Sequence, residues 1–273
     1  MLARGREGFV GFADLGDVRL FHTDDGEGDG ALLLVHGWGS DSHEWIHHIP
    51  ALRARHRVIA VDLRGHGHSS IPEAGNTPQR MADDLARLCA ALGVPRVIAV
   101  GHSMGGQVVS HLAVERPELV AGLVTIDPGY GFDGPVADGF PALMAALRDG
   151  DTHATAVQMD QWTYTPASPG WLREWHRRRI LATPPHVLAE AFSAMFGPDG
   201  IGVRPRSDEY LARRECPVLG FWFDPAKAAW ERGLFKEPRS RTVLWEGSGH
   251  RLHEERPGEF LLVVNKWVKE VMR

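Results

Sequence analysis

Short apolar runs that alternate with amphipathic segments constrain the fold of this chain most strongly. After two short strands expected within residues 9–22, the apolar run at 31–35 is typical of a strand buried on both faces of a sheet. Similar runs follow at 57–61, 96–100, 123–126, 217–223 and 242–245. Helices are expected near 42–53, 77–92, 105–115, 225–233 and 256–271. Because strands and helices alternate, the pattern predicts an α/β fold with right-handed crossovers and a largely parallel, doubly wound sheet.

The alternation stops between residues 132 and 210, where no buried strand is evident. This stretch is rich in Trp, Phe and Met and is interrupted by proline and glycine turns. We therefore expect a mostly helical cap at 132–210, inserted after the sixth strand into a core domain formed by 1–131 and 211–273. The three arginines at 177–179 are expected to form a solvated helix face.

Length, charge and cysteine content exclude several classes of function. The chain has 273 residues, and no run of eighteen apolar residues occurs, so no membrane span is expected. Charged residues interrupt the first twenty positions, which argues against a secretion signal. The net charge of −5 does not favour nucleic acid, and two cysteines, Cys89 and Cys216, do not indicate a disulfide framework. We expect a cytoplasmic monomer or homodimer whose partner is a small molecule, not a membrane or a nucleic acid.

Ser103 is the candidate nucleophile because it is the centre of a G-x-S-x-G motif, GHSMG, that follows a strand and opens a helix. Gly101 and Gly105 suit a sharp turn in which backbone segments approach too closely for a Cβ atom. Such a turn exposes the serine hydroxyl. The alternative is that Ser103 serves only as a helix N-cap.

Four motifs together resemble those of the α/β-hydrolase family, and the resemblance extends over nearly the whole chain. They are HGWG at 36–39, DLRGHGHS at 62–69, GHSMGG at 101–106 and GSGH at 247–250. The resemblance implies an α/β-hydrolase fold, a serine nucleophile, an acid after the sixth or seventh strand and a histidine base near the C-terminus.

His250 is the candidate base because its glycine-containing loop follows the last strand and can bring the imidazole to the carboxyl edge of the sheet. His253 is expected at the surface or in a supporting position. Acyl transfer also needs amides that stabilise an oxyanion, and we expect them from the main chain of Trp38 and Met104. His36 is expected to support the loop that carries Trp38.

The sequence leaves two candidates for the triad acid. The common family pattern after the seventh strand is broken, and Asp224 lies two positions early. Asp127 ends the sixth strand, where some family members place their acid, although Asp-Pro-Gly is also an ordinary turn. We favour Asp127 and keep Asp224 as the alternative.

The segment His43-Glu44-Trp45-Ile46-His47 matches the zinc-protease pattern H-E-x-x-H. Pro50 should interrupt the helix that this motif requires, and no matching third ligand follows. We therefore expect no metal site here. His66 and His68 are expected in a structural loop near the pocket mouth rather than as ligands.

The predicted reaction is ester or lactone hydrolysis through an acyl-enzyme, the chemistry of carboxylic ester hydrolases, with no cofactor. The aromatic cap suggests a bulky, apolar substrate, with aromatic molecules among the candidates. The alternatives are hydrolysis of carbon–carbon bonds in ring-cleavage products, a slowly hydrolysing small-molecule receptor and, last, a zinc hydrolase. Ser103 argues against dehalogenase or epoxide hydrolase chemistry, for which related enzymes use aspartate. The candidate substrate contacts are Gly37, His102, Tyr130, Trp162, Trp171, Trp175, Phe192, Phe196 and Trp222.

Overall fold

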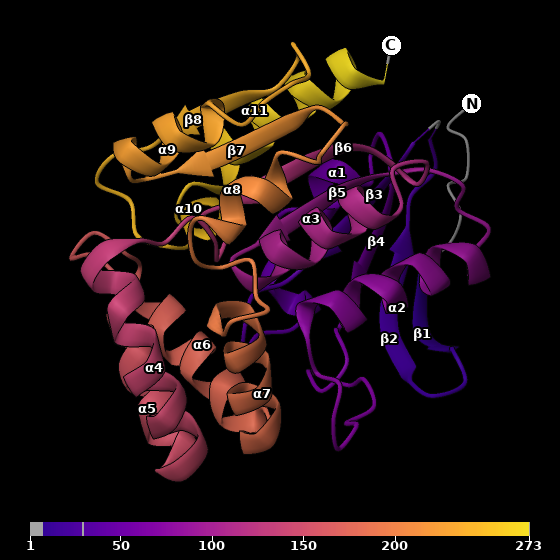
Figure 1. Cartoon of the computed structure of the whole chain (residues 1–273). Coiled ribbons are helices and arrows are strands. Elements are labelled where there is room, and N and C mark those ends of the chain that lie inside the picture. The colour runs from indigo at the N-terminus through magenta and orange to yellow at the C-terminus, as the bar shows by residue number, and fades with distance from the viewer. Residues whose placement is uncertain (1–7, 29, 273) are drawn as a thin grey trace.

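A single eight-stranded sheet organises the protein in a computed structural model that describes residues 8–28 and 30–272. Residues 1–7, Asp29 and Arg273 of the predicted core domain lie outside the described residues. The strand order is β1-β2-β4-β3-β5-β6-β7-β8, with β1 and β2 antiparallel and all pairs from β4 to β8 parallel (Figure 1). The strands are β1 (Phe9–Asp14), β2 (Arg19–Asp25), β3 (Ala31–Val35), β4 (Arg57–Val61), β5 (Val97–His102), β6 (Val120–Ile126), β7 (Val218–Trp222) and β8 (Arg241–Leu244). The predicted doubly wound α/β sheet is confirmed.

Both faces of the sheet are covered, which explains the continuous apolar runs. Successive side chains of a strand point to opposite faces. In β3, Leu33 and Val35 belong to the core under α2 (Pro78–Ala91) and α3 (Met104–Glu115), whereas Leu32 and Leu34 belong to the core under α11 (Pro257–Val271). Residue 243 of β8 and its neighbours are only half buried, so the predicted burial of the last strand is wrong. An edge strand has a partner on one side only.

Five helices lie between β6 and β7, in the stretch predicted to form the cap. They are α4 (Gly134–Asp149), α5 (Thr152–Gln161), α6 (Gly170–Ala182), α7 (Pro185–Phe196) and α8 (Arg206–Leu211). Helices α4 to α7 pack against one another and form a body beside one end of the sheet (Figure 1). Arg179 in α6 is buried against Asp41, so the arginine run is not solvated throughout as predicted.

The helix predicted at 42–53 is divided into a short 3₁₀ turn, η1 (Ser42–Trp45), and one helical turn, α1 (Ile49–Leu52). Pro50 lies at the start of α1, where a missing N–H costs nothing, and so it begins a helix instead of ending one. The remaining helices are α9 (Pro225–Arg232) and α10 (Leu252–Glu255). Within the described chain, no helix is long and apolar enough to span a bilayer.

Candidate active site

Ser103 lies at a strained turn between β5 and α3. Its φ is 52°, a left-handed conformation that a residue with a side chain rarely adopts. A Cβ atom at Gly101 would lie 2.2 Å from the carbonyl oxygen of Gly105, and one at Gly105 would lie 2.4 Å from that of Val35. Both glycines are therefore required by close backbone contacts. The Ser103 side chain makes no N-cap hydrogen bond, so the capping role is not what holds it there.

Asp127 and His250 are brought together from 123 positions apart. The Nδ1 atom of His250 is hydrogen bonded to Oδ2 of Asp127, which directly follows β6. With Nδ1–H donating to the carboxylate, Nε2 remains available as the base. Asp224 instead caps α9, where its Oδ1 accepts hydrogen bonds from the amides of Ala226 and Lys227. The geometry thus favours Asp127 as the acid over Asp224.

Ser103, Asp127 and His250 line the same cavity. The imidazole of His102, the residue before the serine, lies 4.6 Å from that of His250 between ring centroids. No hydrogen bond joins Ser103 to His250 among the described residues; bonds of this kind often tighten only in the substrate complex.

The loop after β3, which carries Trp38, is held by the side chain of His36 and by a contact with α7. His36 donates from Nδ1 to the carbonyl of Gly37 at 2.8 Å and accepts at Nε2 from the amide of Leu63 at 3.0 Å, so it supports the loop as expected. The indole of Trp38 donates to the carbonyl of Leu188 in the cap at 3.0 Å. In the described part of the chain, the backbone amides of Trp38 and Met104 have no hydrogen-bond partner, which leaves both for an oxyanion.

The cavity above Ser103 has a volume of about 750 Å³, which is in the range of small-molecule sites. Its apolar wall is a cluster of phenylalanines from the cap and from the segment after β6. Phe140 and Phe196 stack at 4.1 Å between ring centroids, and Phe132 and Phe192 pack edge-on against them. Of the predicted substrate contacts, Gly37, His102, Trp162, Phe192 and Phe196 line the cavity.

Four predicted contacts are not in position to touch a substrate. Tyr130 and Trp222 are fully buried and both donate to the carboxylate of Glu231, which holds them in the core. Trp171 and Trp175 of α6 pack against His47 and His43, between β3 and β4, and neither lines the cavity. The number of aromatic residues in a segment does not show which of them face the cavity. The direction of each side chain depends on how its helix or strand is rotated in the folded chain.

His66 and His68 also lie away from the cavity lining, although they were predicted near its mouth. His66 is buried and donates from Nδ1 to the carbonyl of Arg64, whereas His68 packs on Phe21. Neither histidine therefore contributes to the cavity wall.

The H-E-x-x-H motif does not form a metal site of the zinc-protease kind. His43 and His47 are exposed, whereas Glu44 points inward to His102 and His253. His253 is fully buried, so of its two expected positions, at the surface or in a supporting position, the surface one is wrong. Burial lowers the pKa of His102 to about 3.

A family model for the alpha/beta hydrolase fold matches residues 30–172, more than half of the chain. The chain belongs to this family. Among curated relatives, the dihydrolipoyllysine-residue acetyltransferase component of the acetoin cleaving system of Pseudomonas putida is 38% identical over 235 residues, 84% of this chain and 61% of that protein. The soluble epoxide hydrolase of Corynebacterium sp. (strain C12) is 39% identical over 118 residues, 42% of this chain and 40% of that protein. The chain thus spans less than two thirds of either relative.

A solved structure covers the chain more completely. A thermophilic esterase from Thermogutta terrifontis superposes with a TM-score of 0.81 at 28% sequence identity, over 96% of this chain and 99% of that one.

In this alpha/beta hydrolase Asp160 and Thr163, at and just beyond the end of α5, also hold the His250 loop, a contact that the sequence analysis missed. The amide of His250 donates to the carbonyl of Thr163 at 2.9 Å. Arg251 donates to the Thr163 hydroxyl and to Asp160, both at 2.6 Å. His250 is therefore positioned by the end of α5 and the residues that follow it, as well as by its own loop.

Lys227 is a second missed residue of the cavity. Its ammonium lies 3.2 Å from the ring centroid of Phe132, and burial lowers its pKa to about 8. Lys227 lies three residues after Asp224, in a segment whose sequence is typical of an exposed helix. Only the packing of the folded chain shows that its side chain lines the cavity.

Proposed function

We propose that this alpha/beta hydrolase is a serine hydrolase that cleaves an ester or lactone bond of a bulky, apolar small molecule. The observation that carries the proposal is the strained Ser103 turn at the base of a cavity that also contains the Asp127–His250 pair. A serine hydroxyl is a weak nucleophile and needs a base whose tautomer is held by a carboxylate.

The proposed reaction has two steps. Nε2 of His250 accepts the proton of Ser103 as its oxygen attacks the carbonyl carbon, and the amides of Trp38 and Met104 stabilise the oxyanion. The imidazolium then protonates the leaving alkoxide, and an acyl-enzyme results. Water, deprotonated by His250, attacks the acyl carbon and releases the acid and the free serine.

The cavity supports an apolar substrate of moderate size. The phenylalanine cluster, Met159 and Met195 give the cavity an apolar lining. Two cationic side chains, Lys227 and Arg204, also line the cavity. We propose that the apolar part of the substrate packs against the phenylalanines. The structural similarity to an esterase agrees with this reading, at 28% identity.

The proposal is tested by labelling with a serine-reactive fluorophosphonate, followed by turnover of a panel of p-nitrophenyl esters and lactones. We expect wild type to be labelled once and Ser103→Ala not at all. Ser248→Ala is the matched control, because Ser248 lines the same cavity but lies outside the strained turn, and it should be labelled like wild type.

Each other outcome contradicts part of the proposal. Labelling of Ser103→Ala would refute the nucleophile. Turnover that stops after about one event per site would support a receptor instead. Cleavage of a ring-fission product without cleavage of any ester would support carbon–carbon hydrolysis.

A further inference from the structure

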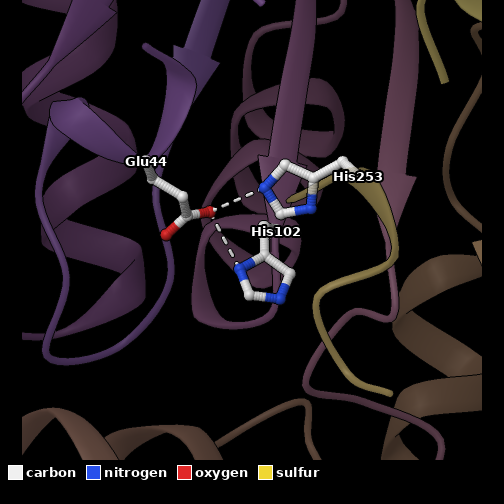
Figure 2. Close-up of side chains that lie close together, drawn as sticks. All are labelled: Glu44, His102 and His253. Atoms are coloured by element: carbon white, nitrogen blue, oxygen red, sulfur yellow. Dashed lines mark ion pairs between the residues drawn. The ribbon is translucent and has the colours of Figure 1, made fainter. Parts of the chain in front are cut away.

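Three side chains from distant parts of the sequence converge beneath the active site. Glu44 comes from η1, His102 from the end of β5 and His253 from α10 (Figure 2). Oε1 of Glu44 lies 2.9 Å from Nδ1 of His102 and 3.2 Å from Nε2 of His253. All three residues are at most 2% exposed.

The three atoms that face one another in this cluster have no hydrogen-bond partner within the part of the chain that the structure describes. Oε1 of Glu44, Nδ1 of His102 and Nε2 of His253 each lack a hydrogen bond of acceptable geometry to any residue the structure describes. Nε2 of His102 faces the carbonyl oxygen of His250 at 3.2 Å, and that oxygen can only accept. Nε2 of a neutral His102 therefore carries the proton, and its Nδ1 presents a lone pair to the Glu44 carboxylate.

The two distances from Oε1 of Glu44 suit a shared cation, and the three candidate ligand atoms lie within 4.8 Å of one another. Zn²⁺ binds imidazole nitrogen at about 2.0–2.1 Å and carboxylate oxygen at about 2.0–2.2 Å. Two such ligands at an angle near 90–110° are about 2.8–3.4 Å apart by that geometry. Ligand atoms that share an ion direct their lone pairs at the ion and not at one another. This arrangement accounts for nitrogen and oxygen atoms that lie close together without hydrogen-bond geometry.

The contacts around His102 and Glu44 are of the kind that orient metal ligands, whereas Nδ1 of His253 has no hydrogen-bond partner among the described residues. Imidazole ligands usually donate their other N–H to a carbonyl or carboxylate, as His102 does to His250. The second oxygen of Glu44 accepts from the amide of Gly37 at 3.2 Å. Two imidazoles and one carboxylate form a donor set that suits Zn²⁺.

We propose that Glu44, His102 and His253 bind one Zn²⁺ ion. The ion would link η1, the end of β5 directly before Ser103, and α10, which follows the His250 loop; each supplies one ligand. The site differs from the sequence motif at 43–47, because it uses the glutamate of that motif and neither of its histidines. It revises the expectation that the protein holds no metal.

The test is a Co²⁺ titration of chelator-treated, dialysed protein, followed by visible absorption, with Zn²⁺ added as competitor. We expect one equivalent of Co²⁺ to produce d–d bands that Zn²⁺ abolishes, and the thermal midpoint of unfolding to rise with Zn²⁺. Glu44→Gln and His253→Asn should each weaken Co²⁺ binding by about 100-fold or more, since loss of a direct ligand costs at least as much as loss of a supporting contact.

The matched control is the double variant His43→Asn/His47→Asn, which removes the motif histidines and should bind Co²⁺ like wild type. Absence of the bands and of Zn²⁺ stabilisation in wild type at millimolar metal would overturn the proposal. Loss of binding in the control, or full binding in Glu44→Gln, would also overturn it. Circular dichroism establishes that each variant is folded, and fluorophosphonate labelling of metal-free wild type tests the Ser103 chemistry separately.

Discussion

Replacing Asp127 by asparagine should nearly abolish turnover while the fold survives. Asparagine tolerates the left-handed φ of 34° at this position, and the backbone amide keeps its bond to the carbonyl of Phe221. The side chain, however, exchanges a carboxylate that accepts from Nδ1 of His250 for an amide that can donate to it. That exchange stabilises the wrong imidazole tautomer, with the proton on Nε2.

The expected size of the effect is a fall in kcat of roughly 10³–10⁴-fold, the range seen when a triad carboxylate is lost. This corresponds to about 4–5.5 kcal/mol of transition-state stabilisation. Asp224→Asn is the control. Asparagine is an N-cap as good as aspartate, so α9 should keep its cap and kcat should change by less than about threefold.

The assay is steady-state hydrolysis of p-nitrophenyl butyrate, normalised to the fraction of Ser103 labelled by a fluorophosphonate. Equal losses in the two variants, or a larger loss in Asp224→Asn, would refute the assignment of the acid. Retained turnover in Asp127→Asn would refute the tautomer argument itself.

Three further changes test the scaffold and the cavity. Gly105→Ala should lower the free energy of unfolding by at least about 1–3 kcal/mol in urea denaturation, because its Cβ would clash with the carbonyl of Val35. Glu231→Gln should cost about 3–5 kcal/mol in the same assay, because it leaves the buried Arg214 without its carboxylate, while kcat per labelled site is retained. The free energy of unfolding of the wild type should rise between about pH 8 and pH 10.5 through Lys227, and Lys227→Met should remove this rise. In that window the unfolded chain holds a proton that the folded lysine has lost, so wild-type stability rises with pH relative to the variant.

Each of these has a definite contrary result. An unchanged urea midpoint in Gly105→Ala would mean that the turn can open without cost. A fall in kcat per labelled site in Glu231→Gln would give the core network a role in catalysis. Parallel pH profiles of stability for wild type and Lys227→Met would contradict the lowered pKa of the lysine.

Much of the fold was readable from local pattern. Strands buried on both faces leave continuous apolar runs, so β3 and β4 begin and end where predicted, and the Ser103 turn was recognisable because its glycines are required by backbone contact. Such features depend on a few neighbouring residues. The prediction failed at η1 and α1, where the position of Pro50 relative to the helix start decided the outcome.

The active site combined both kinds of information. Ser103 and His250 were candidates from their motifs, but Asp127 and Asp224 were left open until the folded chain showed which carboxylate reaches His250. The convergence of Glu44 with His102 and His253 has no local signature at all. Sequence patterns record the short-range demands of strands, turns and caps, whereas a contact between residues 123 or 209 positions apart depends on how whole elements pack, and only the tertiary structure decides it.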